Sequence, residues 1–468
     1  MIDLLSERVG GQILACNDEF FAEAANLINA RDPVWKDGEY TDRGKWMDGW
    51  ETRRRRDAGH DWCVASLGIP GRLRRVIVDT SYFTGNYPEE FSLDASPGGD
   101  VWSEVIPRTP LEGDSSAYFE VGYPHRVVAV RLNIYPDGGV ARLRVEGEPI
   151  PGMQEVCPEG ATDLAAAAIG GRWLEASDFH YSPPSNLLLP TESAGMWDGW
   201  ETRRRRGPGH DWASFRLGLP GVVDAVVVDT THFKGNSPGW VSLDVSKDGD
   251  EWTTVVDHSA VAPDQPNEIH LEAPASAGYV RLSLHPDGGI ARFRVFGVPD
   301  VAAAGAARLD YLNSLFEEAA RGSFLTACVS HRWVDHMTGA RPFESVEAVL
   351  SEAELGFASL READWLQAFA AHPRIGDLGG PTENREQSGT ATASREILND
   401  LVEVNRKYEE KFGFTYIVYA TGKTAEAMLG IARERLGNDR STEIAIAAAE
   451  QRMITRTRLS RMLCQEER

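Results

Sequence analysis

The chain has 468 residues, 42% of them hydrophobic and 25% charged, which is typical of globular protein and too long for one hydrophobic core. Its formal net charge of −23 argues against nucleic acid and anionic membranes as partners, because both bind basic surfaces. There is no apolar run of about 18 residues and no basic N-terminal stretch leading into an apolar core, so we expect a cytoplasmic protein without membrane spans.

The first 300 residues carry one sequence module twice. The repeated motifs are DGWETRRRR at Asp48–Arg56 and Asp198–Arg206, GHDW at Gly59–Trp62 and Gly209–Trp212, and PDGG at Pro136–Gly139 and Pro286–Gly289. The offset is 150 residues throughout, and only upstream does the first copy carry about ten extra residues, near 30–45. This pattern predicts the duplication of a complete domain.

Within each copy, short apolar runs such as Val127–Leu132 alternate with Gly- and Pro-containing turns. Period two with regular turn signals predicts antiparallel strands in a β-sandwich or jelly roll. We expect two such sandwiches, at about 8–150 and 168–298, joined by a linker near 149–168. The expected domains are 1–150, 151–300 and 301–468.

Two copies of DGWETRRRR, GHDW and PDGG, in order, resemble allantoicase, a family of duplicated galactose-binding-like β-sandwich proteins. The resemblance implies conversion of allantoate to ureidoglycolate and urea. Allantoate has a carboxylate and two ureido groups on one carbon, so its site needs a cation, hydrogen-bond partners and an acid–base group. Candidates in the repeated motifs are Glu51, His60, Asp61, Arg142, Glu201, His210, Asp211 and Arg292. Further candidates are the arginines of Arg53–Arg56 and Arg203–Arg206, with Asp79 and Asp229.

Each candidate also has a structural interpretation. Side chains of an extended segment alternate between faces, so at most half of four consecutive arginines could reach one pocket. His60 and Asp61 have no second His or Cys at ligand spacing, and the five cysteines are scattered without CxxC pairing. A divalent metal for the allantoicase reaction therefore stays an open question. The competing hypothesis is a sandwich that binds carbohydrate or another ligand without catalysis.

After Pro299 the apolar residues recur at the spacing of an α-helix. Ala302–Ala307 is expected as a small-residue linker, and Phe414–Ala420, a lone strand-like run, as buried irregular or helical backbone. Helices are expected near 344–353, 362–371, 390–412, 424–436 and 441–464. These features predict an all-α domain.

The motifs of this region are, in order, Ala371–Asp377 (AHPRIGD), Arg385–Gly389 (REQSG), Asn405–Tyr408, Thr421–Lys423 and Arg456–Leu459. They resemble the decarboxylase of 2-oxo-4-hydroxy-4-carboxy-5-ureidoimidazoline (OHCU), a family of small helical proteins that form S-allantoin. The resemblance implies that His372 delivers a proton and that Glu386 contacts the substrate or orients the imidazole. It further implies substrate contacts from Pro373, Glu383, Gln387, Tyr416, Ile417, Val418, Tyr419, Ala420 and Arg458. Glu383 stands where the family often has a small hydroxyl residue.

Loss of CO2 leaves a carbanion that an adjacent imine or carbonyl can absorb, so no cofactor is expected for the decarboxylase. The combined hypothesis is a bifunctional enzyme of urate breakdown with small-molecule substrates. Its two reactions are not consecutive, because another enzyme must open allantoin to allantoate between them. The resemblance also implies a homo-oligomer, and an alternative is that the helical domain only scaffolds such an oligomer.

Overall fold

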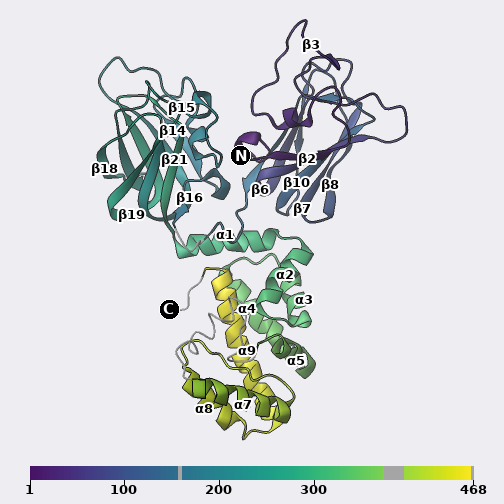
Figure 1. Ribbon diagram of the computed structural model, residues 1–468, viewed down its shortest axis with the longest axis vertical. Coiled ribbons are helices and arrows are strands. Elements are labelled where there is room, and N and C mark those ends of the chain that lie inside the picture. The colour runs from purple at the N-terminus through teal and green to yellow at the C-terminus, as the bar shows by residue number, and fades with distance from the viewer. Residues whose placement is uncertain (157–160, 374–394, 465–468) are drawn as a thin grey trace. The chain divides into compact units, whose positions relative to one another are not determined.

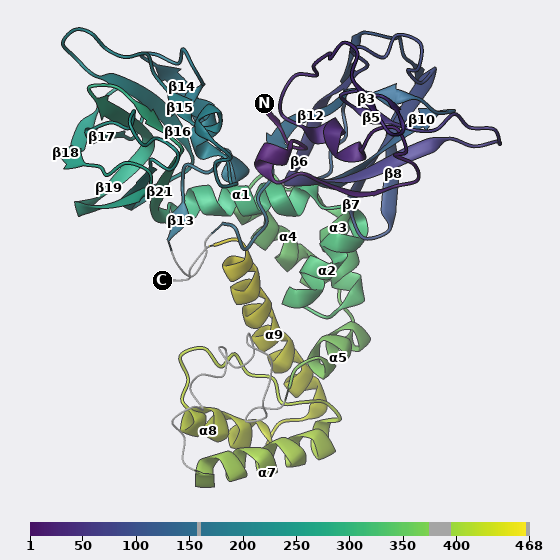
Figure 2. The ribbon, with the colours of Figure 1, turned by 45° about the horizontal axis from the view of Figure 1, so that its top comes forward.

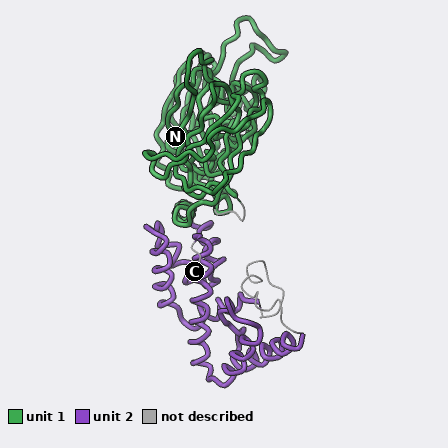
Figure 3. Tube along the Cα trace, turned by 90° about the vertical axis from the view of Figure 1, so that its left-hand side faces the viewer, with its two compact units in different colours: residues 1–316 green, residues 317–468 purple. Residues whose placement is uncertain are grey.

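The computed structural model describes residues 1–156, 161–373 and 395–464. The chain divides into two compact units, residues 1–316 and residues 317–468 (Figures 1 and 3). Among the described residues, the first unit contains the β-strands, short 3-10 helices and one α-helix, and the second unit contains α-helices. Glu383, Glu386 and Gln387 lie outside the described residues.

The first β module begins earlier than expected, at residue 2. Its strands are β1 (Ile2–Asp3), β2 (Gln12–Cys16), β3 (Tyr40–Thr41), β4 (Gly44–Lys45), β5 (Trp50–Glu51), β6 (Asp61–Asp79), β7 (Glu90–Gly98), β8 (Val101–Pro110), β9 (Ser116–Glu120), β10 (Val127–Tyr135), β11 (Gly139–Val140) and β12 (Arg142–Pro149). Short 3-10 helices lie at η1 (Glu7–Val9) and η2 (Ala24–Ile28). The strands of this module pair in antiparallel fashion throughout.

Strand β6 joins the two layers of this module. Its first half lies between β2 and β10, and its second half lies between β12 and β9. Buried and less buried residues alternate along most of its 19 positions, as the period of two predicts for a strand with one face on a core. Val76, Leu93 and Leu132 contribute to that core and are at most 1% exposed. The module is therefore an antiparallel β-sandwich.

The second module repeats this architecture from residue 162. Its strands are β13 (Thr162–Asp163), β14 (Arg172–Ala176), β15 (Trp200–Glu201), β16 (Asp211–Asp229), β17 (Trp240–Ser246), β18 (Thr253–Ala260), β19 (Pro266–His285), β20 (Gly289–Ile290) and β21 (Arg292–Pro299). The 3-10 helices are η3 (Ala167–Ile169), η4 (Pro184–Leu188) and η5 (Met196–Asp198). Strand β16 takes the place of β6, and the single strand β19 replaces β9 and β10. Two tandem sandwiches, as the repeated motifs predict, are confirmed.

The expected linker at Ala302–Ala307 is wrong, because these residues lie inside helix α1 (Val301–Ser314). Alanine has the highest helix propensity, and the Asp300 carbonyl accepts a hydrogen bond from the Ala304 amide at 2.9 Å. Asp310 of this helix pairs with Arg72 at 2.9 Å. Helix α1 therefore belongs to the β unit, which ends at residue 316.

The second unit is helical. Its helices are α2 (Glu317–Ala327), α3 (His331–Gly339), α4 (Val346–Ala358), α5 (Glu362–Ala370), α7 (Arg395–Phe412), α8 (Ala425–Arg435) and α9 (Arg440–Met462). Helix α9 packs against α2, α4 and α5, while α7 and α8 lie side by side (Figure 2). None of the described helices is long and apolar enough to cross a membrane.

Residues 413–420 form no helix or strand and are largely buried, as expected for this isolated apolar run. The segment is fixed by Arg435, which donates to the Ile417 carbonyl at 2.8 Å. Arg435 is itself buried and also donates to Glu443 at 2.7 Å, so its charge is compensated inside the unit.

Candidate functional site

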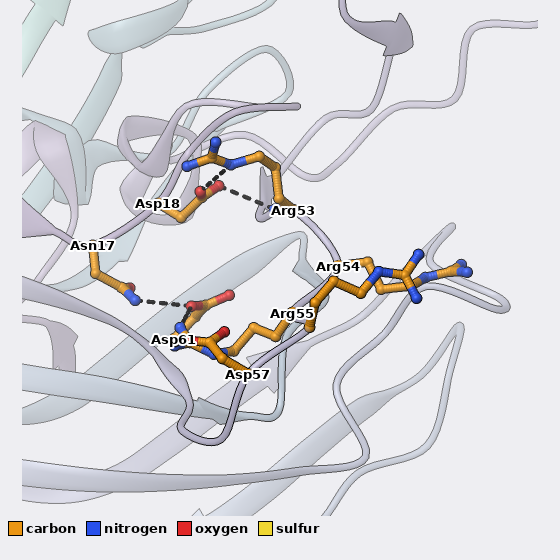
Figure 4. Close-up of a pocket in the computed structure, with 8 residues that line it drawn as sticks. Asn17, Asp18, Arg53, Arg54, Arg55, Asp57 and Asp61 are labelled. Atoms are coloured by element: carbon orange, nitrogen blue, oxygen red, sulfur yellow. Dashed lines mark hydrogen bonds and ion pairs between the residues drawn. The ribbon is translucent and has the colours of Figure 1, made fainter.

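The arginine segment Arg53–Arg56 lines a cavity of about 350 Å3 in the first module (Figure 4). Arg53 donates to Asp18 and Arg55 to Asp61, each at 2.6 Å. All four arginines border this cavity. Arg53 and Arg55 extend toward Asp18 and Asp61, whereas Arg54 extends to the opposite side of the loop that follows β5 (Figure 4). These labelled side chains therefore alternate, as expected for consecutive residues of an extended segment.

The same pairs recur in the second module. Arg203 pairs with Asp178 at 2.8 Å, and Arg205 pairs with Asp211. Asp61 is only 1% exposed; its Oδ1 also accepts from Asn17, whereas its Oδ2 has no hydrogen-bond partner among the described residues. Ion pairs that appear in both copies indicate that these residues fix the loop after β5 and β15 in the shared fold.

Arg142 and Arg292 are buried, each 2% exposed. Arg142 donates to the Asp48 carboxylate at 2.9 Å and to the carbonyl of Arg31 at 2.9 Å. Arg292 makes the equivalent bond to Asp198 at 2.8 Å. Because these guanidinium groups are surrounded by protein acceptors, they hold the segments before β5 and β15 in place.

The histidines of the two GHDW motifs pack against other aromatic rings. His60 Nε2 lies 3.3 Å from Asn133 Oδ1, and its ring lies against Tyr135 with centroids 4.7 Å apart. His210 lies at the same distance from His285. Among residues 1–156, 161–373 and 395–464, no group of three or more His, Cys, Asp or Glu side chains is arranged to hold a metal ion.

A second cavity of the first module, about 240 Å3 in volume, surrounds Glu51 at the end of β5. We call it the Glu51 pocket, and its lining residues are Phe21, Trp35, Lys45, Met47, Glu51, Tyr82, Thr84 and Asn86. Asn86 Nδ2 donates to Glu51 Oε1 at 2.8 Å. Burial raises the pKa of Glu51, and the hydrogen bond from Asn86 acts in the opposite direction. A carboxyl group that retains its proton more readily than usual is suited to act as an acid.

The cation of the Glu51 pocket is Lys45. Its Nζ lies 3.7 Å from the centre of the Trp35 ring, and this ring lies 5.8 Å from that of Tyr82. Trp35 and Lys45 come from the region of ten extra residues in the first copy, where β3 pairs with β4. The motifs named Glu51 as a candidate but missed these two residues, and the only available signal was the length difference between the copies.

In the helical unit, His372 lies two residues after the end of helix α5, and its backbone amide donates to the Phe369 carbonyl at 3.1 Å. The buried segment with Tyr416–Ala420 lies beside α9, because the Tyr419 hydroxyl and Thr457 Oγ1 are 3.1 Å apart. Arg458 is the next residue of α9. The structure thus brings two of the candidate groups together, the Tyr416–Ala420 segment and the part of α9 that carries Arg458.

The comparisons with known proteins agree with this architecture. A family model described as allantoicase repeat matches residues 2–150 and 162–300, and one described as OHCU decarboxylase matches residues 313–460. A probable allantoicase of Pseudomonas paraeruginosa is 46% identical over 320 residues, covering 64% of this chain and 96% of the relative. One of Streptomyces avermitilis is 41% identical over 331 residues, covering 66% and 87%. The crystal structure of allantoicase from Saccharomyces cerevisiae superposes with a TM-score of 0.55 at 32% identity, covering 63% and 92%.

The duplicated sandwich and the helical unit therefore define a two-part enzyme of purine catabolism. The chain belongs to the allantoicase family, and its C-terminal region carries an OHCU decarboxylase domain. These matches favour catalysis over a sandwich that only binds carbohydrate.

Proposed function

We propose that the Glu51 pocket hydrolyses allantoate to ureidoglycolate and urea, and that the helical unit decarboxylates OHCU to S-allantoin. The observation that carries the first part is the presence of Lys45, Glu51 and Asn86 in one cavity of about 240 Å3. They supply the cation, the acid and the amide that allantoate requires. The cavity is smaller than the roughly 300–1,000 Å3 of drug-sized sites, which suits so small a substrate.

The pocket residues suggest how a urea is exchanged for water. Lys45 binds the substrate carboxylate, and protonated Glu51 donates its proton to the nitrogen of the departing urea as the C–N bond breaks. The remaining ureido nitrogen shares its lone pair with the central carbon and forms a C=N bond. Water then adds to this carbon and returns a proton to the Glu51 carboxylate. The acid is regenerated, and ureidoglycolate is left.

The substitution Glu51→Gln tests this assignment, because glutamine keeps the oxygen that accepts from Asn86 but cannot exchange a proton. We expect kcat for urea release to fall by about 10²- to 10⁴-fold, the usual contribution of general acid–base catalysis. The wild-type enzyme should lose activity as the pH rises through the pKa of Glu51, and the variant should lack this limb of the profile. Unchanged kcat in the variant would rule out Glu51 as the acid.

For the decarboxylase, the proposal assigns proton delivery to His372, because an imidazole can both donate and accept a proton near neutral pH. Arg458 clamps the carboxylate or the ureido group of OHCU. The residues proposed beside them, Glu383, Glu386 and Gln387, lie outside the described residues. Pro373 and the Tyr416–Ala420 backbone complete the proposed substrate contacts.

The proposal includes no metal ion or organic cofactor in either reaction. The proposal also places the protein in the cytoplasm, because both substrates are small soluble molecules. From the family resemblance, it further includes assembly into a homo-oligomer.

A further inference from the structure

The two β modules keep the same carboxyl–amide pair but differ in what surrounds it. Asn236 donates to Glu201 at 2.7 Å in the second module, as Asn86 does to Glu51 in the first. The second module has no counterpart of the ten extra residues, so the Trp35 ring is missing. Gly195 occupies the position 150 residues after Lys45.

A short segment, Ser193–Asp198, takes the place of the extra residues. Met196 Sδ lies 3.7 Å from the Asn236 amide nitrogen, so a thioether contacts the amide that would meet a substrate. The Ser193 carbonyl lies 2.8 Å from Nε2 of His232, which replaces Tyr82. The amide beside Glu201 therefore meets the Met196 thioether, a contact that Asn86 does not make among the described residues of the first module.

Among the described residues of the second module, no cation stands at the position equivalent to Lys45, which is Gly195. Lys234 stands where the first module has Thr84, but it pairs with Asp264 at 3.5 Å. Without the contribution of Lys45, an anionic substrate gains no charge-assisted bond there.

The same segment reaches the first module. The Arg31 guanidinium lies 4.4 Å from the centre of the Trp197 ring, within the range of a cation–π contact. Asp198, next in the chain, accepts a hydrogen bond from Arg8 of the first module at 2.6 Å. The Arg31 carbonyl accepts from Arg142, and Trp35 follows only four residues later. Trp197 thus contacts the start of the segment that carries Trp35 and Lys45 into the Glu51 pocket.

From these contacts we infer that each chain has one allantoate site, in the first module, and that Trp197 of the second module is a positioning residue for it. The inference rests on the proposed function of the Glu51 pocket. Duplication has left the second module with the fold and the carboxyl–amide pair, while its Ser193–Asp198 segment supports the pocket of the first.

The matched pair Glu51→Gln and Glu201→Gln tests the single site, because both substitutions keep the hydrogen bond from the neighbouring asparagine. Glu201→Gln should release urea at the wild-type rate, whereas Glu51→Gln should be inactive. Calorimetric titration of Glu51→Gln with allantoate should give one bound molecule per chain. Two molecules per chain, or equal loss of activity in both variants, would overturn the inference.

Trp197→Ala tests the positioning role. Loss of an exposed cation–π contact should raise KM for allantoate about two- to fivefold with little change in kcat, and Trp197→Phe should restore most of the affinity. Arg31→Ala should raise KM equally, and the double variant no further. If Trp197→Ala lowers the melting temperature but leaves KM unchanged, its role is only structural and the inference fails.

These outcomes separate the two proposals. A wild-type chain that releases no urea, or an active Glu51→Gln, contradicts the proposed function itself. An active wild type, an inactive Glu51→Gln and an equally inactive Glu201→Gln contradict only the inference of a single site.

Discussion

At the level of single residues, burial separates the charged groups that hold the first module together from those available to a substrate. Arg142 is 2% exposed and meets protein acceptors, and Asp61, 1% exposed, is paired with Arg55. Glu51 is only half-buried and faces a cavity that also contains Lys45. Removing a buried partner would leave an uncompensated charge, so Arg142 and Asp61 matter first for stability.

The repeated motifs predicted part of the candidate site. Glu51 lies in DGWETRRRR and is among the candidates from the sequence, whereas Asn86, in a Gly-Asn pair that both copies contain, is not. From the sequence alone, Arg142 is an equally good candidate for binding the substrate carboxylate. Only the folded chain shows that Arg142 is buried, because its partners Asp48 and Arg31 are distant in the sequence. Lys45 lies in no repeated motif, so only the folded chain shows that it shares a cavity with Glu51. The roles of all these residues stay predictions.

Lys45→Met removes the proposed partner of the substrate carboxylate while keeping an unbranched side chain. We expect KM for allantoate to rise about tenfold to a hundredfold, because a hydrogen bond to a charged group contributes about 1.5–3 kcal/mol. The change should appear in steady-state assays of urea release. The control is Lys36→Met, on the same insertion, since Lys36 lies over Trp46 and outside the pocket. Equal KM values for the two variants would contradict the role of Lys45.

At the level of elements, residue patterns predicted the alternating strands and the long helices. Segments whose structure depends on tertiary packing were predicted less completely. The alternation of apolar and polar residues with a period of two predicted strand β6, whose residues alternate in burial. Ala302–Ala307 was expected as a linker, but high helix propensity and packing against the β unit make it part of α1. Phe414–Ala420 has strand composition, yet it has no partner strand among the described residues and is held by Arg435 and by Glu450.

The second module also contains a cluster of three histidine rings. His285 stacks on His210 and on His258, with centroid distances of 4.7 and 4.5 Å. Burial lowers the pKa of His285, His210 and His258 lower it further, and Asp257 acts in the opposite direction. The unfolded chain, with a pKa near 6.5, therefore binds this proton more tightly than the folded chain. The stability that neutral His285 contributes is complete above about pH 6.5 and is lost as the pH falls through the folded-state pKa.

The first module suggests the variant that tests this effect. Tyr135 is the counterpart of His285, and its hydroxyl lies 3.0 Å from Ser92 Oγ, as His285 Nε2 lies 2.9 Å from Ser242 Oγ. In His285→Tyr we expect the melting temperature of the β unit to fall less between about pH 8 and about pH 5 than in the wild type, measured by calorimetry of the full chain.

The control is His270→Gln, because the His270 side chain is 74% exposed. This variant should keep the pH dependence of the wild type. If His285→Tyr loses as much melting temperature on acidification as the wild type, proton linkage at His285 is excluded as a major contribution.

At the level of the whole molecule, the two family matches fall largely within the two compact units. The allantoicase repeats end at residue 300, and the OHCU decarboxylase match begins at 313, within α1 and shortly before the unit boundary at 316. The proposed catalytic groups, Glu51 and His372, lie in different units. Since allantoin must be opened by another enzyme between the two reactions, direct transfer between these groups is not required.

The most direct test of this account is a crossed assay of the wild type, Glu51→Gln and His372→Ala. Each protein is assayed for urea release from allantoate and for accelerated decay of OHCU, with and without a chelator. The account predicts that Glu51→Gln loses only urea release, that His372→Ala loses only the acceleration of OHCU decay, and that the chelator changes neither wild-type activity. Loss of both activities from either single substitution would contradict two independent sites, and loss of wild-type activity with the chelator would contradict catalysis without a metal.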